Sequence, residues 1–155
     1  MSLLEKVGEQ GAFAIKAEVD RALKQIGDDP SAAAHYAGNI LEATFKHYLK
    51  ESGVTHMESA TLAELWPLVR ESLGINPKDL ESKDLKKISS GLNSIVDGTM
   101  HLRNNRSAAH GKSIEASERA RLSSRHARLV VNSASTLAEY VMDCLKDRQI
   151  GKRAS

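Results

Sequence analysis

The residues best suited to chemistry lie together in the segment LRNNRSAAHGK, residues 102–112. Arg103 and Arg106 supply guanidinium groups, which are fixed cations whose planar donors fit the oxygens of a phosphate. His110 supplies an imidazole, whose ordinary pKa lets it give and take protons near neutral pH. Asn104 adds an amide that can both donate and accept hydrogen bonds. Together these residue types predict chemistry on a phosphate group.

The spacing of Arg103 and His110 allows one phosphate to lie between them. In an unbroken helix this spacing corresponds to about two turns, nearly one face, and roughly 10 Å along the axis. If a turn intervenes, the two side chains could come closer still. The residues alone leave an alternative open, in which Arg103 and Arg106 are surface charges and His110 is a loop residue bonded to backbone.

The positive charge of the chain is concentrated around this segment. The whole chain of 155 residues has a formal net charge of +2. Residues 103–128 hold 7 Lys and Arg against 2 Asp and Glu, whereas residues 1–102 hold 11 against 15. This distribution predicts that any acidic partner binds near residues 103–128.

Apolar residues recur at helical spacing along most of the chain, which predicts an all-α bundle of four to five helices. Asp29 and Pro30 predict the start of one helix, because Asp is a good cap and Pro fits the first turn. Thr61 and Glu64 have the spacing of a capping box. Residues 104–113 are expected to form a turn between the last two helices. The expected helices cover residues 3–26, 30–51, a short piece after Thr61, a piece from about 82 to 103, and about 115–147.

The length fits one main domain. We expect a helical extension over residues 1–29, the main helical domain over 30–148 and a basic, flexible tail over 149–155. Cys144 is the single cysteine, which excludes an intramolecular disulfide and points to a reducing compartment. The sequence holds no apolar run long enough to span a bilayer and does not start like an export signal. We therefore expect a cytoplasmic protein with no membrane partner.

Arg103-Asn104 followed by His110 resembles the Arg-x4–6-His motif of the HEPN superfamily, the higher eukaryotes and prokaryotes nucleotide-binding domains. More specifically, LRNNRSAAHGK resembles the abortive-infection (Abi) C-terminal domain family, with Ser107 as a departure where relatives often carry Gly. The resemblance covers about residues 30–147. It extends to the blocks HYAGNILEATFKHYL at 35–49, TLAELWPLVRESLGINP at 61–77, LKKISSGLNSIVDG at 85–98 and RHARLVVNSASTLAEYV at 125–141.

This resemblance implies a metal-independent endoribonuclease without a cofactor, acting on RNA as a homodimer whose two motifs meet at the interface. Reaction chemistry supports the pairing independently. Attack by a ribose 2′-hydroxyl needs a base for that hydroxyl, an acid for the leaving oxygen and cations for the transition state. One chain offers a single motif histidine, whereas a two-fold axis supplies a second His110 and a second Arg103. The resemblance also implies a role in prokaryotic defence against phage, where an antitoxin protein would be a further partner.

The resemblance assigns Arg103 as the phosphate clamp, His110 as general base or acid, and Asn104 as an orienting residue. It implies no metal ligand. Other basic residues are expected along the RNA backbone: Arg106, Lys112, Arg121, Arg125 and Arg128. For Arg121, Arg125 and Arg128, which are expected on the last helix, a basic face exposed to solvent is an equally good interpretation. Two other classes of function stay open, namely a non-catalytic RNA- or nucleotide-binding module and a purely structural dimerisation module.

Glu42 and Lys46 lie four residues apart on the helix expected over 30–51. Their block is one of those that resemble the family, so they could contact the Arg103 motif. An ordinary ion pair on the helix surface is the interpretation that the sequence favours.

Overall fold

A computed structural model of the chain describes residues 9–108 and 122–154. Within these ranges the chain is helical and forms no strand. The predicted all-α class is therefore confirmed. The elements, in chain order, are α2 (Glu9–Asp28), α3 (Pro30–Glu51), α4 (Leu62–Leu73), the short 3-10 helix η1 (Pro77–Asp79), α5 (Lys83–Ala108) and α7 (Ser124–Ala154).

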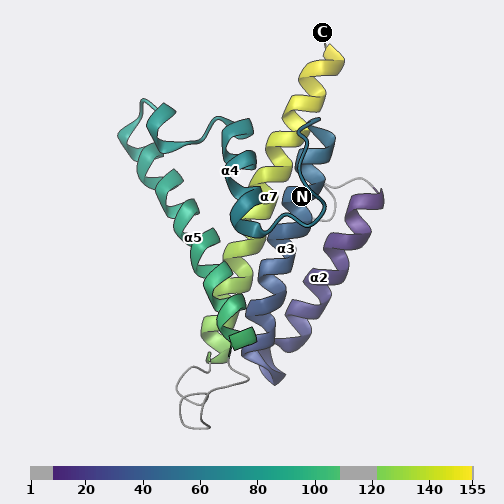
Figure 1. The fold of residues 1–155 in the computed structure, drawn as a ribbon, viewed down its shortest axis with the longest axis vertical. Coiled ribbons are helices and arrows are strands. Elements are labelled where there is room, and N and C mark those ends of the chain that lie inside the picture. Colours follow the sequence, from purple (N-terminus) through teal and green to yellow (C-terminus); the bar gives the residue numbers. More distant parts are fainter. Residues whose placement is uncertain (1–8, 109–121, 155) are drawn as a thin grey trace.

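Helix α3 is the centre of the bundle, and α2, α4, α5 and α7 all pack against it (Figure 1). It begins where the sequence predicts, because the side chain of Asp29 accepts a hydrogen bond from the Ala32 N–H at 3.1 Å and Pro30 occupies the first turn. Its small and apolar residues are buried from Ala32 to Leu49. A helix buried on several sides can hold a side chain from each neighbour in a fixed place.

Helix α2 is built into the same core as the rest of the bundle. Ile15 and Ala22 of α2 are completely buried and belong to one apolar cluster with α3 and α7. The predicted boundary at residue 29 therefore separates segments that share a core, and a separate extension over residues 1–29 stays a prediction.

Helix α4 confirms the capping box. The side chain of Thr61 accepts a hydrogen bond from the Glu64 N–H, and the Glu64 side chain accepts one from the Thr61 N–H. Gly74 ends the helix in the left-handed conformation, with φ of 71°. Trp66 of this helix stacks on Phe45 of α3 at a centroid distance of 5.3 Å and is a buried core residue.

The turn predicted over residues 104–113 is wrong over its first residues, because α5 continues through Ala108. Asn lowers helix stability by less than about 1 kcal/mol, so two adjacent Asn residues do not end a helix that packing supports. Helix α7 begins at Ser124, and residues 115–121 of the last helix predicted over about 115–147 lie outside the described residues. Ser123 caps α7, since its hydroxyl accepts a hydrogen bond from the His126 N–H at 3.4 Å.

The far end of α7 also differs from the prediction, because residues 149–154 are helical rather than a flexible tail. No proline lies in this segment, and a single glycine, Gly151, costs only about 1 kcal/mol in a helix. Arg148, just before this segment, fixes α7 to the rest of the bundle. Its guanidinium donates to the Ser72 carbonyl oxygen at 2.8 Å and lies over the Tyr48 ring, 5.8 Å from the centroid.

Candidate functional site

Arg103 lies near the end of α5, where this helix crosses α3. Its side chain is only 15% exposed. It lies flat against α3 at Gly38, where an added Cβ would come within 2.9 Å of the Arg103 Cδ. Glycine is a poor helix residue, and here it leaves room for the arginine. Arg103 is therefore not the surface charge that the residues alone left open.

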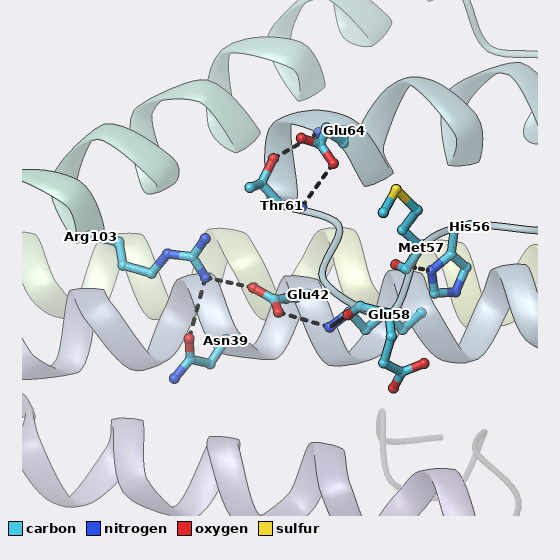
Figure 2. A network of polar contacts seen from close by, with 9 residues as sticks. Asn39, Glu42, His56, Met57, Glu58, Thr61, Glu64 and Arg103 are labelled. Carbon is cyan, nitrogen blue, oxygen red and sulfur yellow. Dashed lines mark hydrogen bonds and ion pairs between the residues drawn. The ribbon is translucent and has the colours of Figure 1, made fainter.

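Two side chains of α3 hold one nitrogen of the Arg103 guanidinium (Figure 2). Its Nη1 donates to the Glu42 Oε2 at 3.0 Å and to the Asn39 Oδ1 at 3.3 Å. These two bonds use both hydrogens of Nη1. The Nη2 and Nε groups donate to no residue that the structure describes. The Nη1 group of the guanidinium is thus fixed. The Nη2 and Nε groups can still donate hydrogen bonds, and phosphate oxygens are suitable acceptors for them.

Glu42 is ionised at neutral pH. Burial acts to raise the pKa of this carboxyl, but hydrogen bonds and charge interactions with Lys46 and Arg103 outweigh burial and lower it below 4.5. Its Oε1 accepts from the Lys46 Nζ at 3.1 Å, and Lys46 also donates to the Glu58 carbonyl oxygen at 3.2 Å. A chain of polar contacts therefore connects Arg103 to the loop before α4 (Figure 2).

Glu42 makes both of the contacts that the sequence left open. It forms the ion pair within α3, and it also binds Arg103 of the motif, which was the less favoured interpretation. Gly38 and Asn39 were not identified from the sequence. A glycine inside a strongly patterned helix is the signal that could have marked them, because such a residue often allows another group to approach closely.

The other predicted site residues are placed in part. Asn104 is exposed on α5, directly after Arg103, and Arg106 lies in the last turns of that helix. Arg125 and Arg128 are exposed on the first turns of α7, at the same end of the bundle as the end of α5 (Figure 1). Three predicted residues, His110, Lys112 and Arg121, lie outside the described residues. The structure thus brings Arg103 together with Asn39 and Glu42.

A cavity of about 460 Å³ opens beside this network, between α2 and α3. Asn39, Glu42 and Lys46 line it, together with Glu18 and His47. Burial lowers the pKa of His47, and nearby charges change it less, so this imidazole is neutral near pH 7. The network therefore faces a hollow lined with hydrogen-bonding groups.

The described residues form neither a metal site nor a membrane span. Within residues 9–108 and 122–154, no three His, Cys, Asp or Glu side chains are grouped so that they could hold a metal ion. In the same ranges, no helix is both long and apolar enough to cross a bilayer. The polar network around Arg103 is thus the site that the described side chains support best.

The chain matches the model of the family Abi_C, described as a HEPN-like domain, over residues 14–145. The match begins inside α2 and ends inside α7, so among the described helices it covers α3, α4 and α5 in full and most of α2 and α7. No protein of curated function and no solved structure is significantly similar to the chain.

Proposed function

Because this chain belongs to the Abi_C family of HEPN-like domains, we propose that it is a metal-independent endoribonuclease that works as a homodimer. The observation that carries the proposal is the position of Arg103. Its guanidinium is oriented by Glu42 and Asn39 while the Nη2 and Nε donors have no described acceptor. A cation that is already oriented stabilises a developing negative charge without reorganising during the reaction.

In the proposed reaction the 2′-hydroxyl of one nucleotide attacks the adjacent phosphorus. A base takes the hydroxyl proton, the bond from phosphorus to the 5′-oxygen breaks, and an acid protonates that oxygen. The products are a 2′,3′-cyclic phosphate and a 5′-hydroxyl. His110 of each protomer fills one of the two proton-transfer roles, Arg103 binds the non-bridging oxygens, and Asn104 orients the imidazole or the phosphate.

The RNA strand is proposed to follow the basic residues at the same end of the bundle. Exposed Arg125 and Arg128 on α7 support this path, because their charges are available to solvent. Arg106, Lys112 and Arg121 are its other proposed members. Contacts to phosphates release counterions, so the affinity for RNA should fall steeply as salt rises.

The proposed biological role is prokaryotic defence against phage, in which RNA cleavage halts the infected cell. Family membership is its support, and a neutralising antitoxin is a partner consistent with it. The geometry of Arg103 does not bear on either point.

The direct test is cleavage of mixed RNA by the purified protein in EDTA. We expect cleavage by the wild type and a rate about 10²- to 10⁴-fold lower for His110→Ala. His56→Ala is a matched control, because His56 lies in the loop before α4 and its ring contacts the carbonyl oxygen of the neighbouring Met57 at 2.9 Å. This control should cleave at the wild-type rate.

The outcomes separate the classes of function that the sequence left open. Full activity in His110→Ala would exclude the proposed mechanism. RNA binding without products from the wild type would indicate a binding module, and neither binding nor products would leave a dimerisation module.

A further inference from the structure

A second cavity, separate from the Arg103 network, opens between α4 and α5. Its volume is about 380 Å³, within the range of about 300–1,000 Å³ that small-ligand sites occupy. Part of its wall is apolar and part carries hydrogen-bonding or charged groups. The residues that matter for its chemistry are Trp66, Arg70, Asn93, Asp97 and Met100.

Arg70 is a cation whose bonding within the described chain is incomplete. Its Nη1 donates to the Asn93 Oδ1 at 3.2 Å. Its Nε is buried and has no hydrogen-bond partner, and no described carboxylate forms an ion pair with it. The guanidinium thus makes one side-chain hydrogen bond, to Asn93, and no ion pair within the described chain, so it can still bind an acceptor that a ligand brings to the cavity wall.

Asn93 is oriented so that it adds donors to the same wall. Its Oδ1 accepts from the Trp66 Nε1 at 2.8 Å as well as from Arg70. With the oxygen engaged by two donors, the amide nitrogen is the part that remains for a ligand. The cavity therefore combines the guanidinium of Arg70 with the amide of Asn93, and phosphate oxygens are the acceptors that such a pair suits.

Asp97 gives the cavity a second kind of group. It lies on α5 one turn after Asn93, its side chain is 66% exposed, and it pairs with His101 at 3.4 Å when that histidine is protonated. A carboxylate accepts hydrogen bonds from hydroxyl or amine groups and repels a bare phosphate. The mixture favours a whole nucleotide, with phosphate, sugar and base, over a free inorganic anion.

The cavity also lies in line with Arg103 along α5. Asn93, Asp97 and Met100 line it at intervals of three or four residues, and Arg103 follows three residues after Met100. Residues at these intervals share one face of a helix. Asn93 and Arg103 are separated by about 15 Å of helix rise, so one RNA strand can reach both.

We propose that this α4–α5 cavity binds one nucleotide of the RNA strand whose reactive phosphate lies at Arg103. The inference rests on the proposed function for its ligand. Arg70 and Asn93 bind the phosphate of that nucleotide, and Asp97 accepts from its sugar or base. The cavity is thus a subsite that adds affinity for longer RNA.

The test is binding of fluorescent single-stranded RNA by His110→Ala protein, with and without Arg70→Gln. For RNA of about eight nucleotides, loss of the Arg70 charge should weaken binding roughly five- to tenfold. The salt dependence of log K should become shallower by about 0.7, the value for one phosphate contact on a single strand. A dinucleotide is too short to reach both sites but can still bind at Arg103 alone, so Arg70→Gln should weaken its binding by less than about twofold.

Two further variants keep the test independent of folding. Arg21→Gln removes an equal charge from an exposed position on α2 and should change neither affinity nor salt dependence. Ala63→Glu places a negative charge on the cavity wall at an exposed position in the first turn of α4, where an acidic residue favours the helix. It should also weaken binding of the longer RNA.

The results distinguish this proposal from the proposed nuclease. If Arg70→Gln and Ala63→Glu bind the longer RNA as tightly as the parent protein, the subsite is excluded even where the wild type cleaves RNA. If both variants bind more weakly but the wild type yields no products, the subsite is supported and the nuclease is excluded. A wild type that binds no RNA contradicts both.

Discussion

Gly38 determines where Arg103 can lie, although it has no side chain of its own. Its neighbours on α3, Asn39 and Glu42, then fix the guanidinium. These partners are more than 60 residues from Arg103 in the sequence, so no local pattern connects them. The sequence could predict that Arg103 matters, from its type and its family resemblance, but only the packing of α5 on α3 identifies what holds it.

Replacing Gly38 by alanine should separate activity from stability. The added Cβ would displace the Arg103 side chain, which it approaches to 2.9 Å, so we expect RNA cleavage to fall about tenfold or more. The free energy of unfolding should change by no more than about 1 kcal/mol, because the preference of a helix for alanine over glycine opposes the loss of the Arg103 bonds to Glu42 and Asn39. Cleavage rates and urea unfolding measure the two effects.

Gly91→Ala is the matched control for this substitution. Gly91 lies within α5 with nothing near its absent Cβ, so its replacement should stabilise the protein by about 1 kcal/mol and leave cleavage unchanged. Wild-type cleavage by Gly38→Ala would show that the position of Arg103 against α3 has no part in the reaction.

Glu42→Gln should lower both activity and the dependence of stability on pH. The pKa of Glu42 is lowered in the folded protein. Its ionised form therefore stabilises the fold above the ordinary value of 4.5, and this contribution is lost as the pH falls through the lowered folded-state pKa. The glutamine variant has no such contribution at any pH.

Thermal unfolding from pH 7 to pH 3 measures this difference. The wild type should have the higher midpoint at pH 7, and the gap between the two proteins should close in acid. Glu71→Gln is the control, because Glu71 is exposed on α4 and lies outside the polar network of Asn39, Glu42, Lys46 and Arg103. A gap that is constant from pH 7 to pH 3 would mean that the Glu42 charge does not stabilise the fold.

Among the helices, the sequence predicts the bounds well where capping residues, proline or glycine mark the ends. Helix α3 has the predicted bounds because Asp29 and Pro30 mark its start and Gly53 follows its end. The last turns of α5 and α7 carry no signals of this strength, and both helices extend beyond their predicted ends. The apolar pattern also does not fix which residues are buried, because Leu85 and Ile88 fit the pattern of α5 but are 52% and 61% exposed.

The capping box of α4 should contribute to the stability of the protein. Thr61→Ala removes the acceptor for the Glu64 N–H and should lower the free energy of unfolding by about 1 kcal/mol. Thr61→Ser keeps the hydroxyl and should restore most of the loss. Urea unfolding of the three proteins measures it, and equal midpoints would show that the box does not stabilise α4.

For the whole molecule, the proposed reaction needs two chains, because it uses two histidines and one chain has one motif histidine. The specific activity, measured per chain, should therefore fall on dilution over the range in which sedimentation shows the dimer separating into monomers. Specific activity that stays constant while the protein becomes monomeric would place a complete site within one chain.

A mixed dimer of one wild-type chain and one His110→Ala chain tests whether the site is shared between chains. The two chains can be co-expressed with different tags, and the mixed dimer can be isolated and assayed for cleavage of RNA in EDTA. It keeps a single His110, so one of the two proton-transfer roles is unfilled, and we expect cleavage at least about 10²-fold slower than that of the wild-type dimer. A mixed dimer with about half of the wild-type activity would mean that each chain holds a complete site, and it would contradict a site shared between chains.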